Sequence, residues 1–347
     1  MNNTIQFKLN ALRFGTPQTF RQLTIIPLFD EAMPSDFISL KTALERGLAI
    51  VTEVDDAGSV PELKVINKGT KPILIVDGEE LVGAKQNRIV NTSILIAAAS
   101  EIVIPVSCTE SGRWHYEKAA RHSPDSTGTE YRNEYAFASS DSMMYASARS
   151  AKSARVMQFK SMTNTYSADQ SKVWEEVSML HEKLGTSSQS SAMSDAYHQK
   201  EGDLSEYLAA FPVLPNQKGM IALVEDAARA VDFIANAEVY ADLHEKLVKS
   251  FAVECLTMPE LVAADGDETS ADDNLKIKAW QLINQLDDAQ ESIFEPIGLG
   301  SDVRLDGEKI GAAALVYDNA LAHLSIFSKE NTMLSGDAFS TRRQRYF

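Results

Sequence analysis

The sequence has little cysteine, no long apolar run and few basic residues. Its 347 residues include two cysteines, Cys108 and Cys255, which are too far apart to form a metal or redox motif. The longest apolar stretch, residues 94–106, is interrupted by polar residues and a proline, so it falls short of the roughly 18 residues that span a bilayer. The first residues lack the basic and apolar regions of a signal peptide. We therefore expect a reduced, cytoplasmic protein that does not enter a membrane.

Basic residues are outnumbered by acidic ones. The chain has 33 Lys and Arg against 49 Asp and Glu, which gives a net charge of −16 at pH 7. A surface of this charge repels a phosphate backbone, so general nucleic-acid binding is not expected. A few local arginines can still bind a small phosphorylated ligand within an acidic protein.

The common cofactor and metal motifs are missing as well. The six histidines form no HxH or HxxxH pair. The sequence also lacks a Gly-rich phosphate loop, a nucleophile-elbow serine and a dinucleotide fingerprint. We therefore predict neither a cofactor nor a metal ion.

Residues 1–118 are rich in strand-forming sequence. Short apolar runs such as residues 23–30, 49–54 and 101–108 are separated by turn residues. Asp77 and Gly78 lie between two such runs and indicate a hairpin turn. Six or more short strands at this spacing predict a β-sandwich or a jelly-roll-like barrel.

The rest of the chain combines helices with strands. Residues 119–153 have no clear period and predict an irregular loop or lid. Residues 154–330 form an α+β region that starts with an amphipathic helix, which has Ser167 or Asp169 as its N-cap and Gly185 as its stop. Residues 331–347 are predicted to form a tail. The predicted fold is α+β, with the N-terminal barrel or sandwich packed on a C-terminal region of β-hairpins and helices.

The C-terminal region contains two similar segments. Residues 219–235 (GMIALVEDAARAVDFIA) align without gaps to residues 311–327 (GAAALVYDNALAHLSIF). Both segments predict a hairpin with its turn at Asp226 or Asp318. Either the hairpin is duplicated, or two Ala-rich hairpins resemble each other by composition.

The polar residues of the stretch GEELVGAKQNR form the first candidate site. On a strand, Glu79 and Glu80 point to opposite faces, and Gln86, Asn87 and Arg88 follow at the next turn. Arginine can bind a phosphate or carboxylate with two parallel hydrogen bonds, and amides can bind a ribose or a base. The structural alternative is a buried network in which Arg88 pairs with Glu79 or Glu80.

A second candidate group follows the strand that ends at Cys108. A nucleophilic cysteine needs a lowered thiol pKa, and an isolated cysteine at a strand end is otherwise a small core residue. Glu110, Arg113 and Trp114 lie in the loop that follows, where a scaffold can present functional side chains. Trp114 can stack on a base or a sugar, or it can cover the end of the barrel.

Several stretches of the chain resemble a known protein family. They are VDGEELVGAKQNRIVNTSILIAAASEIVIPVSC with ESGRW, then VWEEV, SSAMSDAY and EYLAAFP, then QKGMIALV leading into LHEKLVKSFAVEC, and finally AAALVYDNALAHLSIF. Between about residues 23 and 327 the chain resembles the first type of the ARG and rhodanese-phosphatase-superfamily-associated protein domain, a largely bacterial family. The resemblance implies a role near ADP-ribose or related nucleotide metabolism, in company with phosphatases, and it implies no particular reaction.

We therefore expect a protein that binds, and in one version hydrolyses, a small anionic nucleotide-like metabolite. Glu80, Cys108 and Glu110 are the catalytic candidates, and Glu80 is the first choice for acid/base work. The candidates for ligand binding are Glu79, Gln86, Asn87, Arg88, Arg113 and Trp114. The alternative is a non-catalytic module that binds a partner enzyme through its acidic surface.

Overall fold

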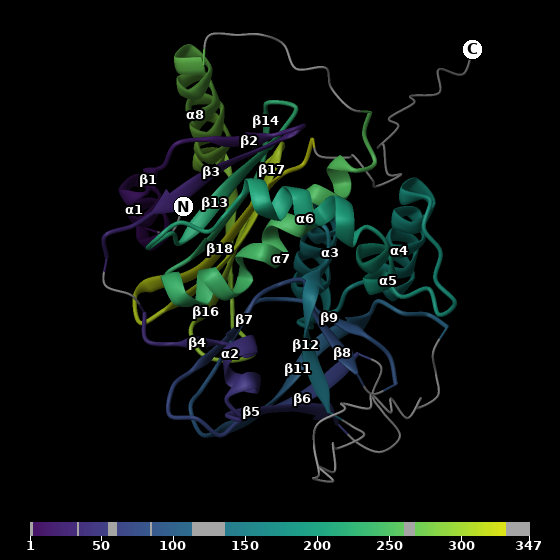
Figure 1. Ribbon diagram of the computed structural model, residues 1–347. Helices are drawn as coiled ribbons and strands as arrows, with labels where there is room; N and C mark the ends of the chain where they lie inside the picture. Colours follow the sequence, from purple (N-terminus) through teal and green to yellow (C-terminus); the bar gives the residue numbers. More distant parts are fainter. Residues whose placement is uncertain are drawn as a thin grey trace, which may run out of the picture.

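The structure, a computed structural model, confirms the α+β class. It describes residues 3–32, 35–54, 61–83, 85–112, 136–259 and 268–330. Two bodies of β-structure stack on one another, with helices between and around them (Figure 1). A curled sheet forms the lower body and a large antiparallel sheet forms the upper one.

The lower body is a six-stranded barrel. Its strand order is β12 (Phe137–Met143), β8 (Glu79–Gly83), β9 (Arg88–Val90), β11 (Ser100–Cys108), β6 (Glu62–Asn67) and β5 (Ala49–Glu53). A single bridge between Thr52 and Ala136 joins the two edge strands, so the sheet closes on itself. Alternate residues of β5 and β6, such as Val51 and Val65, are buried in its interior.

One end of the barrel is covered by a small sheet and a short helix. The sheet has the order β10 (Ile94–Ile96), β7 (Ile73–Ile75) and β4 (Ile38–Ser39), and the helix is α2 (Leu40–Glu45). Leu40 and Ala43 of α2 enter the same apolar cluster as the barrel interior. Because β5 begins beside α2 and ends at Glu53, the side chain of Glu53 lies toward the opposite end of the barrel.

The upper body is the large antiparallel sheet. Its order is β1 (Arg13–Phe14), β3 (Leu23–Phe29), β13 (Gly219–Val224), β14 (Ala227–Ile234), β18 (Ala320–Ser328), β17 (Ile310–Tyr317), β16 (Ser301–Asp306) and β15 (Gln290–Phe294), with β2 (Gln18–Phe20) beside β3. β3 pairs with β13, so a strand of the N-terminal region belongs to the C-terminal sheet. The domain boundaries at residues 118 and 154 remain predictions.

Helices cover both faces of this sheet. The outer face packs against α1 (Asn3–Ala11), α8 (Glu268–Asn284) and the short 3-10 helix η1 (Gln285–Asp288). The inner helices are α3 (Ala146–Thr163), α4 (Gln170–Leu184), α5 (Met193–Gln199), α6 (Glu201–Ala210) and α7 (Ala237–Cys255). α4 confirms the predicted amphipathic helix, with Asp169 as its N-cap and Gly185 as its C-cap.

Two local predictions were wrong. Asp77 and Gly78 form a turn, but β7 and β8 do not pair with each other, because each belongs to a different sheet. Only Gly78 has a positive φ, of 86°, whereas the two-residue hairpin turn expected here needs two positive φ values. Within the predicted loop 119–153, residues 136–153 form β12 and the start of α3. α3 shows no apolar period because its buried face contains Ala, Ser and paired cations.

Both predicted hairpins are present, side by side in one sheet. β13–β14 turns at Glu225 and Asp226, and β17–β18 turns at Asp318 and Asn319, each with two positive φ values. Asp226 is thus the second residue of its turn, while Asp318 is the first. The hairpins therefore correspond with a shift of one residue from the sequence alignment.

This shift changes which faces the matched side chains occupy. Leu223 packs on the outer face of the sheet, whereas Leu315, its partner in the alignment, packs on the inner face. The two hairpins share a topology, but the matched side chains do not occupy equivalent positions.

The second residue of each turn should limit stability. Glycine adopts a positive φ without the cost that L-residues incur, so we expect Asp226→Gly and Asn319→Gly each to raise the free energy of unfolding by up to about 1 kcal/mol. Alanine at either position should lower it by about 1 kcal/mol. Urea denaturation measures the free energy of unfolding of the wild type and of each variant. An alanine variant more stable than the matching glycine variant would contradict the turn assignment.

Candidate functional site

The barrel wall separates the predicted site residues into two groups. In the pairing of β8 with β9, Leu81 lies opposite Arg88 and Glu80 lies opposite Ile89. Leu81 belongs to the barrel interior, while Ile89 belongs to the cluster outside the barrel. Directly opposed residues share a face of a sheet, so Arg88 points into the barrel and Glu80 points out of it.

Arg88 is the charged residue at the centre of the inner group, and it is only 1% exposed. Its Nη1 donates to Gln86 Oε1 at 2.9 Å and to Cys108 Sγ at 2.8 Å. Its Nη2 lies 4.0 Å from Glu53 Oε1, and its Nε has no hydrogen-bond partner among the residues that the structure describes. The edge of the guanidinium formed by Nε and Nη2 therefore has no close acceptor from the described part of the chain.

The thiol of Cys108 adds no charge to this group. Burial raises the pKa of Cys108, and the nearby guanidinium of Arg88 opposes the shift, while Glu53 supports it. The thiol is therefore protonated at neutral pH and serves Arg88 as a neutral acceptor. A nucleophilic role would require a base to remove its proton.

Glu80, in the outer group, is fully buried and surrounded by hydroxyls. Its carboxylate accepts from Thr109 Oγ1 at 2.9 Å, from Ser140 Oγ at 3.0 Å and from Ser142 Oγ at 2.8 Å. Burial raises the pKa of Glu80, and these hydroxyls oppose the shift. The carboxylate ties β8 to β12 and to the segment that follows β11.

Glu79 has a partner that the sequence did not suggest. Its Oε1 lies 3.0 Å from Lys246 Nζ, on α7, and its Oε2 accepts from the backbone N–H of Val76 at 2.9 Å. Lys246 also donates to Ser139 Oγ at 2.8 Å. The ion pair that the structure describes for Arg88 is with Glu53, so the predicted pairing of Arg88 with Glu79 or Glu80 is wrong.

Asn87 and Glu110 connect the remaining segments. Glu110 Oε2 accepts from the backbone N–H of Asn87 at 3.2 Å, and Asn87 Nδ2 donates to Ser194 Oγ at 3.2 Å. Gln170, on α4, binds both the N–H and the carbonyl of Cys108 at 2.8 Å. The three predicted segments are thus neighbours, although their side chains are divided between two faces. Arg113 and Trp114 lie outside the described residues.

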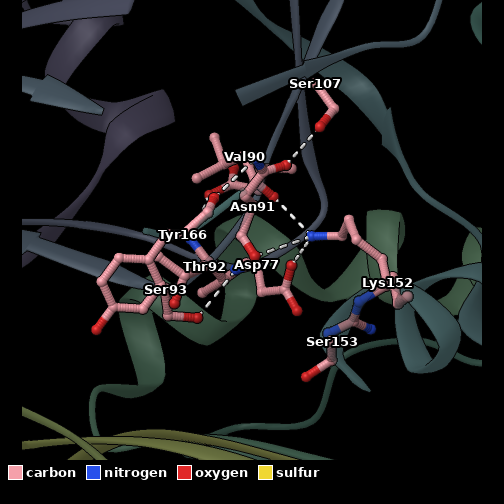
Figure 2. Close-up of polar contacts among 12 residues, drawn as sticks. Asp77, Val90, Asn91, Thr92, Ser93, Ser107, Lys152, Ser153 and Tyr166 are labelled. Carbon is pink, nitrogen blue, oxygen red and sulfur yellow. Dashed lines mark hydrogen bonds and ion pairs between the residues drawn. The ribbon is translucent and has the colours of Figure 1, made fainter. Parts of the chain in front are cut away.

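A larger buried charge network lies between the barrel, α3 and the large sheet. Figure 2 shows Lys152 reaching from α3 to Asp77 and to the backbone of Val90 and Asn91. On the same helix, Arg149 binds both oxygens of Asp232 in β14, at 2.7 and 3.2 Å. All four charged side chains are at most 1% exposed.

The network continues to the far strands of the sheet. Arg304, on β16, donates to Asp302 at 2.8 Å, to Thr92 at 2.7 Å and to Ser153 at 3.2 Å. His323 Nδ1 lies 2.9 Å from Ser93 Oγ. Sequence reasoning missed this network, because its only local signal is the spacing of Arg149 and Lys152 on one face of a helix without apolar period.

The network fits a structural role better than a catalytic one. Its three cations are each in close contact with a carboxylate, which is what burial of charge requires. The cavity beside Arg304 and Ser153 has a volume of about 30 Å³, which is room for a water molecule and not for a substrate.

Within the described ranges, no three His, Cys, Asp or Glu side chains are grouped so that they could hold a metal ion. In the same ranges, no helix is both long enough and apolar enough to cross a bilayer.

The buried His323 makes stability depend on pH. Burial lowers the pKa of His323 from 6.5 to about 4, so its contribution to stability is present above pH 6.5 and is lost as the pH falls through 4. The difference corresponds to about 3 kcal/mol. We expect His323→Asn, which can keep a hydrogen bond to Ser93, to remove this dependence in denaturation curves recorded from pH 4 to 7.

Glu254 provides a control of opposite sign. Burial raises its pKa from 4.5 to about 7, so its contribution is full below pH 4.5 and is lost as the pH rises through 7. Glu254→Gln should therefore gain stability over the wild type at pH 8. If His323→Asn and the wild type lose stability in parallel below pH 6.5, His323 is not the acid-sensitive group.

Comparison with known proteins identifies the family and no individual relative. No curated protein and no solved structure matches the chain. The model of one family, the ARG and Rhodanese-Phosphatase-superfamily-associated Protein domain, matches residues 11–327. That match covers both the barrel with Arg88 and the large sheet, and it agrees with the resemblance found in the sequence. The chain belongs to this family.

Proposed function

We propose that this protein binds a small anionic, nucleotide-like metabolite inside the barrel, at the end opposite α2, with Arg88 as the cation. The family name associates the chain with an ADP-ribose and phosphatase context. Ligands from that context carry phosphate groups, which arginine binds with two parallel hydrogen bonds.

The observation that carries this proposal is the open edge of the Arg88 guanidinium. Arg88 has five N–H donors, and both of its hydrogen bonds in the described part of the chain use Nη1. Buried donors are rarely left without partners, so an unfilled edge calls for a ligand, an ion or a water. An oxyanion at Nε and Nη2 would complete the guanidinium.

The neighbours of Arg88 suit the rest of such a ligand. Glu53 can accept a hydrogen bond from a hydroxyl or an amino group of a molecule whose acidic group binds Arg88. Gln86 orients the guanidinium, and the protonated thiol of Cys108 supports it without competing as an anion. Asn87 and Glu110 fix the adjacent loop.

Binding is better supported than hydrolysis. Glu80, the first choice for acid/base work, lies on the other side of the barrel wall, and three hydroxyls occupy its oxygens. A hydrolytic version of the proposal would need Glu53, which lies 4.0 Å from Arg88 Nη2, or Glu110, which accepts from the N–H of Asn87, in place of Glu80.

The second candidate is a non-catalytic module that binds a partner enzyme. It is favoured by the pairing of Glu79 and Glu80 with protein groups, since buried polar residues can serve the fold alone. In that case water would bind the open edge of Arg88, and the acidic surface would bind the partner enzyme.

Paired variants of two buried arginines test the binding role. Because Glu53 is 4.0 Å from Arg88 and not in close contact with it, we expect Arg88→Gln to cost only about 1–3 kcal/mol of stability, through its lost hydrogen bonds. The same variant should abolish stabilisation by ADP-ribose or AMP. Arg304→Gln, the matched structural control, should cost about 3–5 kcal/mol, because it leaves Asp302 buried and unpaired. Arg304→Gln should still respond to ligand.

The measurement is chemical denaturation of each variant with and without ligand. At a ligand concentration of 100 times Kd, wild type should gain about 2.7 kcal/mol. Equal ligand-induced gains in wild type and Arg88→Gln would reject the role of Arg88 and favour the interaction module.

A further inference from the structure

A cleft lies between α2, β12 and α7, away from Arg88. Its volume is about 330 Å³, within the range of roughly 300–1,000 Å³ that small-molecule sites occupy. α2 lines it with Lys41, Leu44 and Glu45, and α7 lines it with Asp242, Glu245 and Lys246. Both sets have the spacing i, i+3, i+4, so each helix presents one face to the cleft.

An ion pair between Lys246 and Glu79 forms the floor of the cleft. Lys246 is only 3% exposed, although it lines the cleft. Its ammonium uses two of its three N–H groups on Glu79 and Ser139. The third has no hydrogen-bond partner in the described part of the chain. Because Glu79 neutralises Lys246, the floor offers a hydrogen-bond donor and not a free positive charge.

The wall of the cleft offers fixed acceptors. Asp242 Oδ2 accepts from the hydroxyls of Ser39 and Thr42, which hold the carboxylate in place. Its Oδ1 makes no hydrogen bond to the described residues. Four carboxylates line the cleft, against two ammonium groups, so its potential is negative and disfavours phosphate and carboxylate ligands.

We propose that this cleft binds a neutral sugar with adjacent hydroxyls. Lys246 would donate to one sugar oxygen, and Asp242 and Glu245 would accept from hydroxyls. Leu44 and Ala138 provide apolar surface for the C–H groups of the ring. This site goes beyond the proposed function, because α2 covers the barrel end opposite Arg88 and Glu53.

A variant that fills the cleft tests the proposal with D-ribose as the probe. Ala138 is exposed on β12 and lines the cleft, so Ala138→Phe should occupy the cleft without changing a charge or the core. Ala227→Phe, at an exposed strand position on the large sheet, is the matched control. In ligand-observed NMR titrations, we expect wild type and Ala227→Phe to bind ribose alike and Ala138→Phe to bind it at least tenfold more weakly.

Further titrations separate this site from that of Arg88. Ribose 5-phosphate should bind the cleft more weakly than ribose because of the negative potential. Arg88→Gln should leave ribose binding unchanged, and Ala138→Phe should leave the stabilisation by ADP-ribose unchanged. The proposal is overturned if ribose shows no saturable binding, if Ala138→Phe binds it like wild type, or if Arg88→Gln abolishes its binding.

Discussion

The ion pairs that α3 makes on two sides hold the two bodies of the protein together. Lys152 binds Asp77, beside the barrel, and Arg149 binds Asp232 in the large sheet. The two cations are less than one helical turn apart on α3. Removing such charges from water is costly, and it is offset only when both partners are in place. Any displacement of the barrel from the sheet would leave a buried charge unpaired. The network therefore fixes the frame within which both proposed sites lie.

Within that frame, three buried arginines have different surroundings. Arg149 and Arg304 each contact a carboxylate at 2.8 Å or less. The Nε of Arg149 also has no hydrogen-bond partner among the described residues, but Asp232 binds both of its Nη atoms and neutralises it. The described ion pair of Arg88, with Glu53, is longer, at 4.0 Å. Its hydrogen bonds go to the amide of Gln86 and the neutral thiol of Cys108. The proposal that Arg88 binds a ligand rests on this contrast with the two paired arginines.

The sequence allowed the prediction of features that depend on local periodicity. Short apolar runs separated by turn residues predicted the barrel strands, and the amphipathic pattern with Asp169 and Gly185 predicted α4. It failed where partners are distant in the chain. Nothing near Glu79 indicates Lys246, 167 residues away, and the face of Arg88 depends on the register between β8 and β9. α3 was not predicted, because its buried charges remove the apolar period. Arg113 and Trp114 lie outside the described residues.

The direct measurement of the central claim is the NMR signal of the arginine Nε–H groups. The account predicts that adding ADP-ribose shifts the Arg88 Nε–H resonance and slows its exchange with water, because an oxyanion accepts from it. The Nε–H resonances of Arg149 and Arg304 should not move. An Arg88 resonance that stays unchanged at saturating ligand, or a shift confined to Arg149 or Arg304, would contradict the account.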